Sequence, residues 1–335
     1  MAMPVGSGAP EQHSRPHPAA VGAVAVPALE TAIAHHGELL QGVFDRGDGE
    51  LTHAVVSLPY PSLRASAVFV PNGTPRVRVS PAWKVKAGRA AEETLHRLRV
   101  GGGGLLSVHS AIPTERGLGS STADVVSTIR AVASAHGRRL PAEEVARIAV
   151  LAEGAADGIM FGHRAVLYAN RDGTVLEDLG GPLPSLEVLG LDAGGPGVDT
   201  LELPAFDYSP DQIESLRVLR ATMRRAVAGG DCALLAEVAT ASARINQRFL
   251  PQEGLPLVEA VCRDSGGVGV QAAHSGRVLA VLFDPAAPGL ESRIDHARAR
   301  LARNGVDRTW RFRLESPNPR GTTAPLCQEC CEEPL

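Results

Sequence analysis

Residues 112–124, with the sequence IPTERGLGSSTAD, combine two glycines with three consecutive hydroxyl side chains just before a stretch of helical periodicity. Gly117 and Gly119 can adopt positive φ and let backbone N–H groups approach an anion closely. The hydroxyl residues 120–122 stand where the helix is expected to begin, and the unpaired amides of a helix N-terminus bind phosphate. The pattern therefore predicts a site for a polyphosphate and its magnesium ion.

Other interpretations of this loop fit the residues less well. The P-loop requires a lysine that is absent here, and the dinucleotide fingerprint requires glycine where Thr122 stands. A hydrolase would use Ser121 as nucleophile with His274 and Asp192, but its serine would directly follow a strand, whereas eight residues separate the preceding strand from the second glycine. A plain turn capped by a serine stays open.

Composition restricts the class of protein. The chain has 335 residues, 44% of them hydrophobic and 21% charged, which is enough for two ordinary domains with a packed core. A net charge of -4 argues against nucleic-acid and membrane-surface partners. No apolar run approaches the roughly 20 residues of a membrane span, and the N-terminus has no signal pattern, so we expect a cytoplasmic protein.

Five cysteines are present. Cys232 and Cys262 lie in apolar, helix-like contexts and are expected to be buried thiols. Cys327, Cys330 and Cys331 form the tail motif CQECC, which offers too few ligands for an ordinary zinc site and is expected to be a frayed terminus.

Hydrophobic periodicity predicts alternating strands and helices in the first half of the chain. Strands are expected over 64–70, 76–80 and 104–110, and helices from 120 to Gly137 and from Pro141 to about 155. The segment 180–184, GGPLP, is the best linker candidate. Beyond it the order is a strand, two helices, two strands joined at the turn HSG, a helix and a last strand; their ranges are 185–192, 211–228, 231–248, 267–284, 287–305 and 308–314. This order predicts an α+β second half with an antiparallel sheet.

Residues 113–123 match the pattern P-x-x-x-G-L-G-S-S-x-A in full and resemble the phosphate loop of the GHMP kinases. HGELLQG (36–42) is similar to the opening motif of the bacterial L-threonine kinases in that superfamily. The segment 267–283, with its AHSG, resembles the third motif of the same group. Three shorter stretches, DGIMF, GLDAGGPGVDT and NQRFLP, also look like that group.

The resemblance implies a two-domain GHMP kinase fold of the α+β class. Residues 21–183 would form an ATP-binding domain like domain 2 of ribosomal protein S5, and residues 184–316 a ferredoxin-like domain. Residues 1–20 and 317–335 would be a disordered extension and a flexible tail. ATP would lie near the phosphate loop, and the phosphoryl acceptor in the cleft between the domains.

The resemblance also implies roles for individual residues. Ser121 and Glu153 would hold Mg²⁺, although Glu153 is also acceptable as a solvated charge at a helix end. Asp157 stands in an apolar, glycine-flanked segment and would be a general base or electrostatic anchor for the acceptor hydroxyl; its alternative role is a turn before Gly158. The remaining implied residues bind ATP (Pro113, Gly117, Leu118, Gly119, Ser120, Ser121, Thr122, Ser275, Gly276) or the acceptor (His36, Glu38, Gln41, His274).

One departure bears on the acceptor. The threonine kinases have G-T-C-G-E where this chain has AHHGE, and His35 and His36 are bulkier and can carry charge near neutral pH. The expected substrate is thus a small hydroxylated molecule, with threonine first. Another small alcohol such as homoserine, or a non-catalytic sensor of the same fold, remains an alternative. The sequence leaves open whether the chain forms a homodimer.

Overall fold

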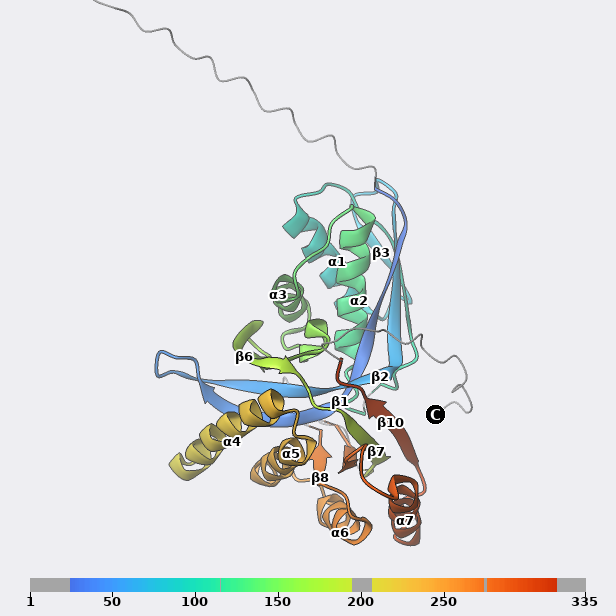
Figure 1. Ribbon diagram of the computed structural model, residues 1–335. Coiled ribbons are helices and arrows are strands. Elements are labelled where there is room, and N and C mark those ends of the chain that lie inside the picture. Colours follow the sequence, from blue (N-terminus) through green and yellow to red (C-terminus); the bar gives the residue numbers. More distant parts are fainter. Residues whose placement is uncertain (1–24, 115, 195–206, 274–275, 318–335) are drawn as a thin grey trace, which may run out of the picture.

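The computed structural model describes residues 25–114, 116–194, 207–273 and 276–317, which form an α+β fold (Figure 1). The expected disordered N-terminus and the tail cysteines lie outside the described residues.

The N-terminal half is built on two long antiparallel strands, β1 (Ala28–Asp45) and β2 (Leu51–Pro71). β4 (Gly104–Ser110) pairs with β2, and the short β3 (Val77–Ser80) runs parallel to β4 at the edge. Three helices pack beside these strands in the upper part of Figure 1: α1 (Val85–Leu98), α2 (Ser120–Ala135) and α3 (Ala142–Glu153). α2 consists largely of Ala, Val, Ser and Thr, small side chains that allow it to be buried between the strands and the other two helices.

After α3 the chain returns to β2 through a segment with its own secondary structure. It contains the 3₁₀ turn η1 (Gly158–Phe161) and the antiparallel pair β5 (Arg164–Ala169) and β6 (Thr174–Pro182). β5 pairs with β2 through Tyr168 and Val55. The segment after Glu153 is therefore held close to the long strands.

The C-terminal half has an antiparallel sheet with helices on it. Its strands are β7 (Leu186–Asp192), β8 (Gly269–Ala272), β9 (Val278–Phe283) and β10 (Thr309–Leu314). Its helices are α4 (Pro210–Gly229), α5 (Cys232–Asn246), α6 (Leu255–Ser265) and α7 (Leu290–Arg303), in the lower part of Figure 1. α4 begins with a complete capping box, in which Ser209 and Gln212 bond each other's backbone N–H groups.

One hydrogen-bonded sheet connects the two halves. Its strand order is β10-β7-β9-β8-β1-β2-β4-β3, and the junction is the pairing of Glu38 on β1 with Ala272 on β8. β1 and β2 bend between the upper and lower parts of the molecule (Figure 1). The HGELLQG segment (36–42), which contains Glu38, thus lies where the two halves meet.

Most of the predicted elements are confirmed. The strand 104–110 has the predicted boundaries. The helix predicted from residue 120 starts there and ends at Ala135, two residues before Gly137. Glu153 is the last residue of its helix. The second half has the expected antiparallel sheet, and Trp310, Phe312 and Leu314 share the buried face of β10.

Other predictions were wrong or incomplete. Gly180 to Pro182 belong to β6, so the connection between β6 and β7 is shorter than the predicted linker. Helices α1 and α6 and strands β1, β5 and β6 were not predicted. β1 is buried on both faces through its centre, so it has no polar–apolar alternation. Cys262 is buried as expected, but Cys232 is only half-buried.

In the part of the chain that the structure describes, no helix has both the length and the apolar composition that crossing a membrane requires.

Candidate active site

The glycine loop ends directly at the first residue of α2. Gly119, at φ 71°, is the N-cap, and no side chain caps the helix. A serine-capped turn would instead place a serine hydroxyl on the first amides. The N-terminus of α2 therefore has the geometry of an anion site, with its positive dipole end facing the pocket.

Gly117 is fixed by a backbone contact with the other half of the protein. It has φ 77°, and a Cβ added to it would lie 2.4 Å from Cα of Gly276. The N–H of Arg277 donates to the carbonyl of Arg116 at 3.3 Å. Gly276 and Arg277, the described residues just before β9, thus pack on the glycine loop. Two of the residues expected there, His274 and Ser275, lie outside the described residues.

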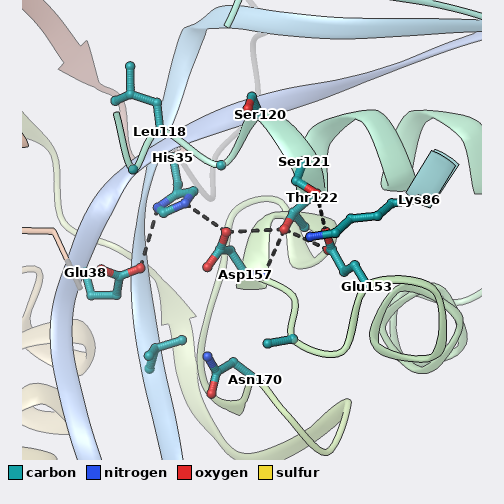
Figure 2. Close-up of a pocket in the computed structure, with 14 residues that line it drawn as sticks. His35, Glu38, Lys86, Leu118, Ser120, Ser121, Thr122, Glu153, Asp157 and Asn170 are labelled. Atoms are coloured by element: carbon teal, nitrogen blue, oxygen red, sulfur yellow. Dashed lines mark hydrogen bonds and ion pairs between the residues drawn. The ribbon is translucent and has the colours of Figure 1, made fainter. Parts of the chain in front are cut away.

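A polar pocket opens in front of this loop (Figure 2). Nine of the residues expected at the site line it: Glu38, Gly117, Leu118, Gly119, Ser120, Ser121, Thr122, Glu153 and Asp157. They come from β1, the loop, the start of α2, the end of α3 and the residue before η1. The fold therefore brings together most of a set that spans more than a hundred residues of sequence.

Glu153 is a buried carboxylate held by neutral hydroxyl groups. Ser121 donates to Oε2 at 2.7 Å and Thr122 donates to Oε1 at 2.9 Å. Burial raises the pKa of Glu153 to about 7. The hydrogen bond from Ser121 lowers this pKa, and the negative charge on Asp157 raises it further. A buried carboxylate in this state gains from a cation in the pocket.

Asp157 stands across the pocket from Glu153. The Thr122 hydroxyl donates to its Oδ2 at 3.3 Å, and the same oxygen lies 2.9 Å from Nε2 of His35. Asp157 is the N-cap residue of η1 but makes no side-chain cap bond there. Its carboxylate is therefore turned into the pocket (Figure 2) and does not stabilise the turn.

A bulge in β1 brings His35 and Glu38 to the same side of the strand. The pairing register with β2 shifts between these two residues, and Gly37 has φ 69°. Without the bulge, residues three apart on a strand would point to opposite faces. A Cβ on Gly37 would lie 2.2 Å from Nε2 of Gln271, so only glycine fits.

A known family of domains matches part of the N-terminal half. Residues 85–164, from α1 to the start of β5, match the GHMP kinases N terminal domain. This segment contains the loop, Glu153 and Asp157. The residues that form most of the pocket therefore lie in a segment that is similar to the N-terminal domain of the GHMP kinases.

Two L-threonine kinases are similar to this chain over most of its length. The one from Salmonella typhimurium is 29% identical over 216 residues, which are 61% of this chain and 67% of that protein. The one from Citrobacter freundii is 27% identical over 250 residues, or 74% of this chain and 83% of that protein.

Solved structures support the superfamily's two-domain fold. Homoserine kinase from Cytophaga hutchinsonii matches with a TM-score of 0.62 and 15% identity, covering 86% of this chain and 95% of that one. At this identity the match shows the fold alone.

Four residues expected at the site lie elsewhere. Pro113 does not line the pocket, and Gly276 contacts the loop from behind. His36 and Gln41 are buried outside the pocket. The bulge at Gly37 directs the His36 side chain away from it, and Gln41 is held through its backbone by Ser242 and Asn246 on α5.

His36 is part of the core between the two halves. Its ring is fully buried against Tyr60, Trp310 and Phe312, and its Nδ1 lies 2.9 Å from Oε1 of Gln271. Burial lowers the pKa of His36 to about 4, more than the hydrogen bond with Gln271 raises it. The neutral ring is therefore the folded form.

His36 should make the fold sensitive to acid. Between pH 6.5 and 4 the unfolded chain protonates this histidine and the folded chain does not, so stability falls as the pH falls through this window. The difference in unfolding free energy between wild type and His36→Phe should change by about 2–3 kcal/mol between pH 7 and 4.5. Urea unfolding at both pH values measures it; a difference independent of pH would contradict a neutral buried His36.

Three polar residues that line the pocket were not predicted as site residues: His35, Lys86 and Asn170. Lys86 comes from the first turn of α1 and points toward Glu153 (Figure 2). Asn170 follows β5. Neither belongs to the quoted motifs, so only the folded chain shows them. His35 was noticed as a departure from the threonine kinase motif, but no role was assigned to it.

Proposed function

We propose that this chain is an ATP-dependent kinase that phosphorylates the side-chain hydroxyl of a small amino acid, with L-threonine as the first candidate. The observation that carries the proposal is the pocket itself. An uncapped helix N-terminus, a buried carboxylate beside two hydroxyls and a second carboxylate meet in one place. Phosphoryl transfer requires these three functions: phosphate binding, charge neutralisation and a proton acceptor.

Magnesium fits the donor set around Glu153. The ion prefers one or two carboxylates together with phosphate oxygens, and Glu153 has only neutral hydroxyls as its hydrogen-bond partners. We assign Ser121 and Glu153 as its protein ligands. When bound, the ion would neutralise charge on the phosphates.

The nucleotide would lie along residues 117–122, with its phosphates at the N-terminus of α2. Lys86 adds a positive charge on the same side. His274 and Ser275, which precede Gly276, are expected to close over the phosphates or the acceptor. We also propose that residues 21–183 and 184–316 act as the two domains, since the short connection from β6 to β7 falls at this boundary.

The acceptor would occupy the end of the pocket near Glu38 and Asp157. Glu38 is buried and suits the ammonium group of an amino acid. The acceptor oxygen would bond to the γ-phosphorus while the bond from that phosphorus to the bridging oxygen breaks and ADP leaves. The hydroxyl proton would pass to Asp157. The names of the two similar kinases support threonine as acceptor.

Coupled ADP release tests the proposal. The purified protein is assayed with Mg·ATP against L-threonine, L-serine, L-homoserine and amino alcohols without a carboxylate. We expect ADP release that depends on acceptor and is fastest with L-threonine, together with phosphothreonine in the product. Faster ADP release with another alcohol would replace L-threonine as the proposed acceptor but would leave the proposed kinase activity in place. ATP binding with no ADP release on any acceptor would favour the non-catalytic sensor.

A further inference from the structure

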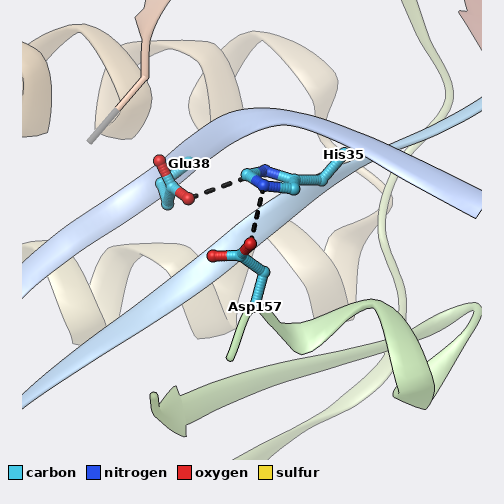
Figure 3. Close-up of side chains that lie close together, drawn as sticks. All are labelled: His35, Glu38 and Asp157. Carbon is cyan, nitrogen blue, oxygen red and sulfur yellow. Dashed lines mark ion pairs between the residues drawn. The ribbon is translucent and has the colours of Figure 1, made fainter. Parts of the chain in front are cut away.

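His35 lies between the two carboxylates of the acceptor end (Figure 3). Its Nε2 is 2.9 Å from Oδ2 of Asp157, and its Nδ1 is 3.6 Å from Oε1 of Glu38. Nδ1 is also 3.3 Å from the carbonyl oxygen of Gly37. Carboxylates and carbonyls only accept hydrogen bonds, so both ring nitrogens must carry a proton. The contacts therefore describe an imidazolium ion.

The ring is also sterically fixed. It is 4% exposed, its backbone N–H donates to the carbonyl of Leu118, and a Cβ on Gly119 would lie 2.2 Å from its Cδ2. His35 thus touches the HGELLQG segment, the phosphate loop and the residue before η1. A cation in this position links the parts of the pocket that would bind acceptor and nucleotide.

The arrangement does not suit a metal ion. His35, Glu38 and Asp157 place ligand atoms within 4.8 Å of one another, as a metal site would. However, the two carboxylates lie at opposite nitrogens of the ring (Figure 3). An ion bound to one nitrogen would leave the other carboxylate on the far side of the ring.

The electrostatics of the pocket agree with a charged His35. Burial lowers its pKa, but the charge and hydrogen bond of Asp157, together with Glu38, raise it to about 9. The other charged groups facing the same pocket are Glu153 from α3 and Lys86 from α1; the loop and α2 contribute only backbone and hydroxyl groups. Over the neutral range the ring would carry its full charge.

We propose that His35 is a positioning residue for phosphoryl transfer, which holds Asp157 through Oδ2 and so presents Oδ1 to the acceptor hydroxyl. The inference rests on the proposed kinase function. The hydroxyl proton moves to Oδ1 as the oxygen–phosphorus bond forms, and His35 keeps both of its own protons. Its charge cancels one of the two carboxylates, which leaves the acceptor end with one negative charge. This end therefore suits an acceptor with one ammonium group near its hydroxyl.

The pH profile of His35 variants tests this role. In His35→Gln the buried side of Asp157 loses its cation, so its pKa rises and the acid limb of kcat/KM moves to higher pH. We expect kcat to fall on the order of 10-fold or more at pH 7 and to recover partly at pH 9, with KM for ATP changed less than 3-fold. His35→Lys restores a cation and should return the acid limb toward that of wild type. The exposed His109→Gln is the matched control and should behave as wild type.

Several results would overturn the inference. If His35→Gln and His35→Lys lost the same fraction of kcat at every pH, the charge of His35 would have no role and the residue would act through packing alone. Stoichiometric binding of Zn²⁺ or Mn²⁺ to the nucleotide-free protein, abolished in His35→Gln, would make the cluster a metal site. Nitrogen NMR at pH 7 separates this inference from the proposed function, because a neutral His35 ring in an active kinase would contradict only the inference. If His35 were doubly protonated but the protein released no ADP, the proposed kinase function would be contradicted, whereas the protonation state inferred for His35 would hold.

Discussion

Asp157→Asn is expected to lower kcat by a factor on the order of 10² or more while Mg·ATP still binds. The asparagine has nearly the same shape and can keep a hydrogen bond with Thr122, so the fold should not change. It cannot take a proton from the acceptor. The loss should therefore fall on kcat, whereas KM for ATP, which depends on the loop, stays near the wild-type value.

Steady-state kinetics and binding of a fluorescent ATP analogue measure these two effects. Asp295→Asn, an exposed aspartate on α7, is the control for the chemical change and should have wild-type kinetics. Turnover of Asp157→Asn within a few-fold of wild type would remove the role of Asp157 as base. The kinase could then depend on the bound phosphates alone to accept the proton.

Glu153→Gln is expected to lower kcat strongly and, at pH 8, to make the folded protein more stable than wild type. Loss of the assigned magnesium ligand should remove several kcal/mol of transition-state stabilisation, on the order of 10²-fold or more in kcat. The pKa of Glu153 is about 7 in the folded chain and near 4.5 when unfolded, so the folded protein binds more protons between these values. Its stability consequently falls as the pH rises through this window, and the charged carboxylate costs roughly 3 kcal/mol at pH 8.

A glutamine avoids this cost, so its melting temperature should exceed that of wild type at pH 8, and by less at pH 5.5. Mg·ATP should raise the melting temperature of wild type and have a smaller effect on the variant. Differential scanning fluorimetry with and without Mg·ATP shows both effects. Glu237→Gln, which changes an exposed acid on α5, is the matched control and should melt as wild type. If Glu153→Gln melted at a lower temperature than wild type at pH 8, the charged Glu153 would stabilise the free protein, which would contradict its assignment as a ligand of a bound cation.

The sequence predicted the end of the pocket formed by the loop and α2 better than the end near Glu38 and His35. The loop and the helix that follows it are contiguous, so their glycines, hydroxyls and periodicity could be interpreted together. Glu153 was identified from its position in the family resemblance, and Asp157 because it is an acid in an apolar, glycine-flanked segment. Local patterns are informative where one segment forms most of a site.

The acceptor end depends on geometry that the sequence does not encode locally. Alternation along a regular strand cannot show that His35 and Glu38 share a face, because the bulge at Gly37 reverses it. The same bulge explains why His36, the motif histidine that was expected to bind the acceptor, is instead buried against Trp310 and Phe312. Lys86 and Asn170 reach the pocket only through tertiary packing.

The shared sheet limits how this protein can be cut or rearranged. β8 gains its neighbour β1 from the other half, so a fragment that starts at β7 would carry an open strand edge where Glu38 now pairs with Ala272. Exposed edges of this kind invite pairing with other chains and aggregation. Expressing residues 184–316 alone should therefore give an insoluble product, whereas co-expression of both pieces could restore a soluble, split enzyme whose assembly reports on contact between them.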